Sequence, residues 1–118
     1  MAILGLAFKP ETDDMREAPA IDIISGLVER GATVRAYDPV AMTEAAKVLP
    51  KVSFADDEYG AVTDADALVF VTEWNQFRAL DMARVRDLMK SPRIADLRNI
   101  YDPEDMRALG FEYVGVGR

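Results

Sequence analysis

Ala67-Leu68-Val69-Phe70-Val71 is the stretch of this sequence that decides its fold. Every side chain in it is apolar, and no polar residue interrupts the run. A strand with one face in water alternates apolar and polar side chains, whereas a strand covered on both faces does not. The run therefore predicts a central strand of a parallel sheet that carries helices on both faces.

Strand and helix patterns alternate on both sides of this run. Pro19 suits the first turn of a helix, an apolar stripe at helical spacing follows it, and Gly31 marks its end. Further strands are expected at residues 1–7, 32–37, 51–54, 93–96 and 111–116, and further helices at 41–49, 58–63, 81–89 and 103–109. Residues 72–75 are expected to form a loop. This alternation implies right-handed crossovers and a three-layer, Rossmann-like α/β fold with a doubly wound, mostly parallel sheet of about six strands.

The composition excludes several classes of function. A chain of 118 residues suffices for one domain, and its net charge of −7 argues against a nucleic-acid-binding face. No segment has the length of uncharged apolar sequence that crosses a membrane. The sequence contains no cysteine and no histidine, so a cysteine nucleophile is excluded and the commonest general base is missing. We expect no catalytic residue in this chain, and a reducing compartment, the cytoplasm, as its location.

The first predicted strand runs directly into a charged loop. Its sequence is Gly5-Leu6-Ala7-Phe8-Lys9-Pro10-Glu11-Thr12-Asp13-Asp14-Met15-Arg16-Glu17-Ala18-Pro19. The loop lacks the G-x-G-x-x-G motif that brings a dinucleotide pyrophosphate against a helix N-terminus. It offers two cations, Lys9 and Arg16, beside the aromatic ring of Phe8. The adjacent acids Asp13 and Asp14 suit a turn and the start of a helix, so no metal site is expected.

The loop resembles the opening of the nucleotide-sugar-binding domain of the UDP-glucose/GDP-mannose dehydrogenase family, which reads G-x-x-F-K-x-x-T-D-D-x-R-x-x-P. The form T-D-D-M-R-E-A-P is most similar to that of bacterial UDP-glucose 6-dehydrogenases. The resemblance continues in order through Gly31-Ala32, Tyr37-Asp38-Pro39, Ala65-Asp66-Ala67, Thr72-Glu73-Trp74, Arg98-Asn99-Ile100-Tyr101-Asp102-Pro103 and Gly110-Phe111-Glu112-Tyr113-Val114-Gly115-Val116-Gly117-Arg118. One departure is Leu97, where many members have a small residue before the arginine.

This resemblance implies that residues 1–118 form the C-terminal, UDP-sugar-binding domain of a longer enzyme, with the strand order 3-2-1-4-5-6. Phe8, Lys9 and Arg98 would bind the UDP-sugar, and Arg16 would reach NAD held by the N-terminal domain. The family oxidises the C6 alcohol of a UDP-sugar to a carboxylate in two hydride transfers, using NAD and a cysteine that this chain lacks. The isolated domain is expected to bind UDP-glucose, or a related nucleotide-sugar, without turnover. We expect it to be a monomer and the full-length enzyme, with its N-terminal and central domains, to be a homo-oligomer.

The expected topology brings the loops after strands 1, 4 and 5 to one edge of the sheet. Ligands of doubly wound sheets bind beyond the carboxyl ends of the strands, where the strand order reverses. Lys9 and Phe8 follow strand 1, and Arg98 follows strand 5. Two cations and an aromatic ring at this edge suit a nucleoside diphosphate, because both cations bind phosphate oxygens and the ring can flank a base or sugar.

Simpler interpretations compete with these roles. They are a solvated loop lysine for Lys9, an exposed ion pair with Asp13 or Asp14 for Arg16, and an ion pair with Asp96 or Asp102 for Arg98. Trp74 fits a cleft wall or a core residue better than a stacking platform. Asp38, where a ribose-binding acid would sit, fits a turn with Pro39 better. The competing functions are a standalone, non-catalytic nucleotide-binding module and the same domain of a GDP-mannose or UDP-N-acetylmannosamine dehydrogenase.

Overall fold

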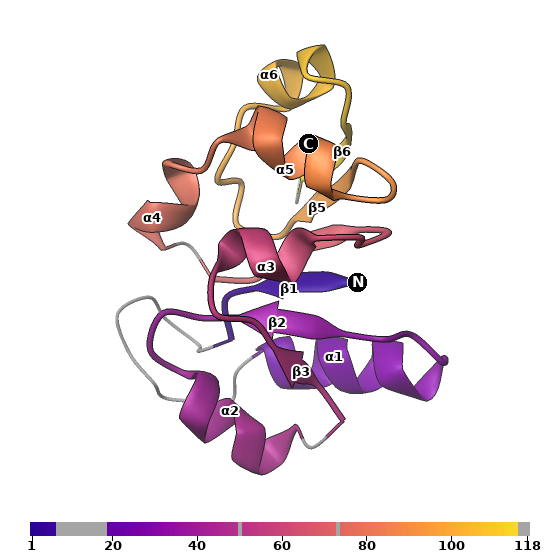
Figure 1. The fold of residues 1–118 in the computed structure, drawn as a ribbon, viewed down its shortest axis with the longest axis vertical. Helices are drawn as coiled ribbons and strands as arrows, with labels where there is room; N and C mark the ends of the chain where they lie inside the picture. Colours follow the sequence, from indigo (N-terminus) through magenta and orange to yellow (C-terminus); the bar gives the residue numbers. More distant parts are fainter. Residues whose placement is uncertain (7–18, 50, 73, 116–118) are drawn as a thin grey trace.

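The computed structural model describes residues 1–6, 19–49, 51–72 and 74–115, which form one open sheet with helices packed on it (Figure 1). The strands are β1 (Ala2–Leu4), β2 (Arg35–Tyr37), β3 (Ser53–Phe54), β4 (Leu68–Phe70), β5 (Arg93–Asp96) and β6 (Glu112–Gly115). The helices are α1 (Pro19–Glu29), α2 (Met42–Val48), α3 (Glu58–Val62), α4 (Asn75–Arg78), α5 (Met82–Leu88) and α6 (Pro103–Ala108). The sheet order is β3-β2-β1-β4-β5-β6 with every pairing parallel, which confirms the expected fold and strand order.

The apolar run at residues 67–71, which predicted a central strand, contains the central strand β4. β4 lies between β1 and β5, and all three of its residues are buried. Leu68 and Phe70 pack into the hydrophobic cluster on one face of the sheet, whereas Val69 packs into the cluster on the other face. Neither face of this strand meets water, and that explains why its sequence does not alternate.

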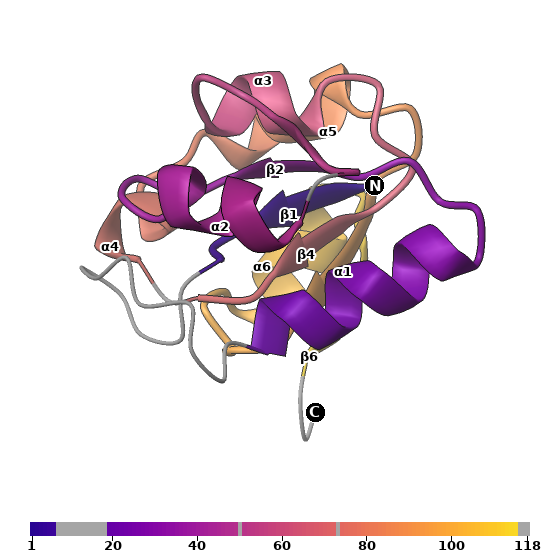
Figure 2. The same cartoon turned by 90° about the horizontal axis from the view of Figure 1, so that it is seen from below.

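The helices form two layers around the sheet. Figure 2 shows α3 and α5 on one side of the strands and α1 on the other. Val62 of α3, Val85 of α5 and Met106 of α6 belong to the cluster of Phe70, and Ile24 of α1 and Ala45 of α2 belong to the opposite cluster. Burying each large aliphatic or aromatic side chain in such a core contributes about 1.5–3 kcal/mol.

The short helix α4 occupies part of the segment that the sequence predicts as a loop. It has four residues, which is one turn, so no apolar stripe at helical spacing can mark it. Phe77 is its fully buried residue, and the Phe77 ring lies 6.0 Å from the ring of Phe70. The burial of this one side chain fixes α4 against the sheet, which is a tertiary effect that local sequence does not encode.

Aspartates set the start of three helices. The carboxylates of Asp57, Asp81 and Asp102 accept hydrogen bonds from backbone N–H groups in the first turns of α3, α5 and α6. Such caps satisfy amide groups that have no partner within the helix. Within the described ranges, no helix combines the length and the apolar character needed to cross a bilayer.

Candidate functional site

The strand order reverses between β1 and β4, and the carboxyl ends of these two strands approach each other closely. Gly5 follows β1 with a φ of 94°, and Thr72, which is fully buried, follows β4. A Cβ atom built on Gly5 would lie 2.5 Å from the backbone nitrogen of Thr72, closer than real Cβ contacts. Only glycine fits at this point. Gly5 therefore allows the carboxyl ends of β1 and β4 to lie close together at the edge of the candidate site.

Gly5 follows the first strand, where the glycines of a dinucleotide-binding turn begin. In a dinucleotide fold the glycines after the first strand let the pyrophosphate approach the helix amides. Here the space that Gly5 leaves is filled by Thr72. The sequence has no G-x-G-x-x-G motif after β1, and residues 7–18, which follow this strand, lie outside the described residues.

Asp38, at the end of β2, is a buried carboxylate that joins two loops. Its Oδ1 atom accepts hydrogen bonds from the N–H groups of Val40 at 2.9 Å and Ala41 at 2.8 Å, which confirms the turn expected for Asp38-Pro39. Its Oδ2 atom accepts the N–H of Leu6 at 2.8 Å. This second bond was not anticipated from the sequence. It holds the chain where it leaves β1, two residues before Phe8.

Replacing Asp38 with Asn should destabilise the fold. The amide offers one oxygen in place of two, so a buried backbone N–H of Leu6, or those of the turn, loses its acceptor, at a cost of about 1–3 kcal/mol. Urea denaturation of the variant measures the change. Asp57→Asn is the matched control, because Asp57 caps α3 at an exposed position and asparagine caps helices equally well. Equal losses in the two variants would contradict this role of Asp38.

Asp96, the last residue of β5, is fully buried and fixes the loop that carries Arg98. Its Oδ1 atom accepts the backbone N–H of Arg98 at 3.1 Å, and its Oδ2 atom accepts that of Tyr101 at 3.0 Å. The Arg98 side chain itself is exposed at the carboxyl edge of the sheet. Asp96 thus holds the backbone of Arg98, a contact different from the side-chain ion pair that the sequence suggested as an alternative. Leu97 is half-buried against the cluster on the α1 side of the sheet.

Two tyrosines complete this network. The hydroxyl group of Tyr113, a buried residue of β6, donates to Oδ2 of Asp96, and the carbonyl oxygen of Tyr101 lies 3.0 Å from the same hydroxyl. The Tyr101 hydroxyl donates to the carbonyl oxygen of Phe77 in α4. Both tyrosines contact the core, and the polar bonds that they make were not anticipated from the sequence.

Tyr101 gives the fold a dependence on alkaline pH. Burial raises the pKa of the Tyr101 phenol from 10.0 to about 12. Because this pKa is higher in the folded state, its contribution to stability is complete below pH 10 and is lost as the pH rises toward 12. The free energy of unfolding should therefore fall over this interval, and it should fall less steeply in Tyr101→Phe. Parallel curves for the two proteins, from denaturation at each pH, would contradict the assignment.

Trp74 lies in the core at the end of β4. It is 8% exposed and belongs to the same cluster as Phe70 and Phe77. This placement agrees with a core or wall residue and not with an open stacking platform. Its indole Nε1 has no hydrogen-bond partner in the described structure.

Of the four site residues predicted from the sequence, the structure describes Arg98. Phe8, Lys9 and Arg16 lie outside the described residues, as do Asp13 and Asp14. In the parts of the chain that are described, no group of three or more acidic, histidine or cysteine side chains could hold a metal ion.

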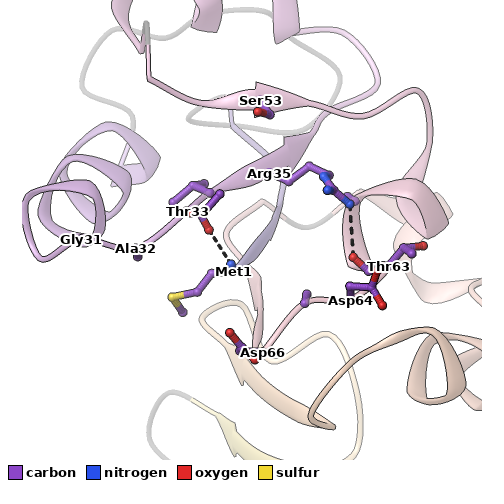
Figure 3. A pocket seen from close by; sticks show the side chains of 12 residues that line it. Met1, Gly31, Ala32, Thr33, Arg35, Ser53, Thr63, Asp64 and Asp66 are labelled. Carbon is purple, nitrogen blue, oxygen red and sulfur yellow. Dashed lines mark hydrogen bonds between the residues drawn. The ribbon is translucent and has the colours of Figure 1, made fainter.

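A pocket of about 380 Å³ lies at the other edge of the sheet, beside the amino ends of β1 and β2 (Figure 3). Arg35 borders it, and its guanidinium donates to the backbone carbonyls of Gly60 at 3.1 Å and Thr63 at 3.2 Å. The terminal amino group of Met1 likewise donates to a backbone carbonyl. The cations of this pocket are thus bound to the protein itself, and they lie at the opposite end of the strands from Arg98.

Comparison with known proteins identifies the family. The profile of the UDP-glucose/GDP-mannose dehydrogenase family, UDP binding domain, matches residues 2–103. The chain is 49% identical to a UDP-glucose 6-dehydrogenase of Rhizobium meliloti, covering 100% of this chain and 27% of that protein. It is 47% identical to a UDP-glucose 6-dehydrogenase of Pseudomonas aeruginosa, again covering 100% and 27%. The chain therefore spans about a quarter of the length of these relatives.

Solved structures agree with the sequence matches. A UDP-D-ManNAc dehydrogenase from Pyrococcus horikoshii superposes with a TM-score of 0.79 at 31% identity, covering 99% of this chain and 25% of that one. An NDP-N-acetyl-D-galactosaminuronic acid dehydrogenase from Methanosarcina mazei superposes with a TM-score of 0.85 at 28% identity, covering 99% and 24%. On the sequence profile, the relatives and the fold together, this chain belongs to the UDP-glucose/GDP-mannose dehydrogenase family, as a UDP-binding domain.

Proposed function

We propose that this chain is the UDP-sugar-binding domain of a longer, NAD-dependent UDP-glucose 6-dehydrogenase, and that it binds UDP-glucose at the carboxyl edge of its sheet. The observation that carries the proposal is the loop after β5, which presents Arg98 at that edge on a backbone fixed by Asp96. Similarity over the whole chain to UDP-glucose 6-dehydrogenases, at up to 49% identity, supports the choice of sugar.

Arg98 brings a positive charge to this edge of a chain whose net charge is −7. Among the described residues, Asp38 and Asp96 are buried acids at this edge, and both carboxylates accept hydrogen bonds from backbone N–H groups. These bonds offset part of the cost of burying the two carboxylates. We propose that Arg98 and Lys9 bind the diphosphate and that Phe8 flanks the nucleoside or the sugar.

NAD is proposed to bind outside this chain, with Arg16 as the contact that reaches it. The sequence after β1 lacks the G-x-G-x-x-G motif that holds a dinucleotide pyrophosphate. The sequence also has no cysteine to act as the nucleophile of the oxidation. We therefore expect the isolated domain to bind UDP-glucose as a monomer without turnover. The complete enzyme, with N-terminal and central domains, is expected to be a cytoplasmic homo-oligomer.

Two alternatives keep the same fold. A domain for another nucleotide-sugar is supported by the superposition on a UDP-D-ManNAc dehydrogenase, although that identity, 31%, is lower than the 49% to a UDP-glucose 6-dehydrogenase. A standalone nucleotide-binding module would bind the ligand equally well. It is distinguished by a gene without an NAD-binding domain and a cysteine-bearing segment in the same reading frame.

An NMR titration of the 15N-labelled domain tests the proposal. UDP-glucose and UDP should shift the amide signals of Arg98 and Thr72, whereas GDP and NAD should leave them in place at the same concentration. Shifts from GDP alone would move the assignment to a guanosine sugar. Shifts from NAD alone would show a cofactor domain, and the absence of shifts with all four ligands at millimolar concentration would contradict binding by this domain.

A further inference from the structure

The loop that presents Arg98 is fixed by a residue from another strand. Tyr113 lies on the edge strand β6, and its backbone is in register with Ile94 of β5. This register brings its hydroxyl group to the carboxylate of Asp96, 17 residues earlier in the chain. Tyr113 is only 4% exposed, so it does not offer its side chain to a ligand at the surface.

The hydroxyl group of Tyr113 has one proton, and among the described residues two acceptors lie close to it. The Oδ2 atom of Asp96 is 2.5 Å away and carries negative charge, whereas the neutral carbonyl oxygen of Tyr101 is 3.0 Å away. The Tyr113 hydroxyl therefore donates its proton to the hydrogen bond with Asp96 and not to the carbonyl of Tyr101. This bond and the one from the Tyr101 N–H orient the carboxylate, whose Oδ1 atom accepts the N–H of Arg98. The chain of contacts runs from β6 through Asp96 to the backbone of Arg98.

Resting on the proposed function, we propose that Tyr113 is a positioning residue for UDP-sugar binding, acting through Asp96 on Arg98. Without the hydroxyl the Asp96 carboxylate loses one of the donors that hold it, and the 97–101 loop gains freedom. Binding must then restrict that freedom again, which lowers the affinity. In the described part of the chain, hydrogen bonds link Tyr113 to Arg98 through Asp96 and the loop backbone.

The test is a double-mutant cycle by calorimetric titration of UDP-glucose into four proteins. These are the wild type, Tyr113→Phe, Arg98→Ala and the double variant. We expect Tyr113→Phe to raise the dissociation constant about 2- to 10-fold in the wild-type background and to have no further effect once Arg98 is removed. Tyr59→Phe is the matched control, since its hydroxyl accepts the backbone N–H of Asp81 at the start of α5, and it should leave the affinity unchanged.

Several results would overturn the proposal. An unchanged affinity in Tyr113→Phe would do so, and so would an equal loss in both backgrounds, because either shows that Tyr113 does not act through Arg98. A failure of Arg98→Ala to weaken binding, or of the wild type to bind, would instead refute the proposed function and the inference with it. The variants of the cycle therefore distinguish a failure of the role of Tyr113 from a failure of the proposed function.

Hydrogen exchange distinguishes a local loosening of the 97–101 loop from a general loss of stability. Tyr113→Phe should accelerate exchange of the Arg98 and Tyr101 amides while that of Val69 in β4 stays slow. Acceleration at all three amides would show a general loss of stability and would count against positioning. If Tyr113→Phe does not fold, Asp96→Asn replaces it in the same cycle. That variant keeps one oxygen for Arg98 and removes the charge that receives the hydroxyl proton.

Discussion

Gly5→Ala is expected to destabilise the domain by about 2–5 kcal/mol, as the sum of backbone strain and overpacking. Gly5 has a φ of 94°, a conformation that residues with a side chain rarely adopt. The added methyl carbon would lie 2.5 Å from the nitrogen and 2.6 Å from the Cβ atom of Thr72. Relief requires β1 and β4 to separate where they carry the site edge, so ligand affinity should fall with stability.

Gly26→Ala is the control for this change. Gly26 lies within α1, and nothing approaches within 4 Å of a Cβ atom built there. The same substitution should therefore stabilise α1, by about 0.5–1 kcal/mol, because alanine loses less backbone entropy in a helix. Urea denaturation of both variants gives the two free energies. Changes of the same sign would contradict the packing assigned to Gly5.

Lys9→Ala and Arg98→Ala should each weaken UDP-glucose binding by about 1.5–3 kcal/mol, which is roughly 10- to 150-fold in the dissociation constant. Each change removes a charge-assisted hydrogen bond to the ligand. Calorimetric titration measures the loss, and thermal melting should show little change for Arg98→Ala, because its side chain is exposed.

Matched control variants distinguish the loss of a direct contact with UDP-glucose from the change in the net charge of the chain. Arg93 lies at the amino end of the same strand as Asp96, and its side chain is 61% exposed in an ion pair with Glu112. Arg93→Ala removes the same charge far from the site and should bind UDP-glucose as the wild type does. Lys47→Ala in α2 is the corresponding control for Lys9. Unchanged affinity in both Lys9→Ala and Arg98→Ala would refute the assigned site.

The fold was predictable because its strongest signals are local. The apolar run at residues 67–71 is a central strand, and the glycine at position 31 ends the turn that follows α1. The expected segments match the observed strands, with ends that differ by a few residues. α4 was missed, because one turn of helix leaves no periodic pattern and is fixed by tertiary contacts such as the burial of Phe77.

The site was predictable in its position and not in its supporting contacts. The topology places the Arg98 loop at the carboxyl edge, as expected. The bond from Leu6 to Asp38 joins residues 32 apart, and the bond from Tyr113 to Asp96 joins residues 17 apart. Such pairs depend on strand register, which a single sequence does not reveal. The roles of Phe8, Lys9 and Arg16 stay predictions, because these residues lie outside the described part of the chain.

A crystal structure of this chain with UDP-glucose tests the central claim most directly. We expect the diphosphate beyond the carboxyl ends of β1 and β5, within hydrogen-bond distance of the Arg98 guanidinium and the Lys9 ammonium group. UDP-glucose in the pocket at the amino edge, beside Arg35, would contradict it.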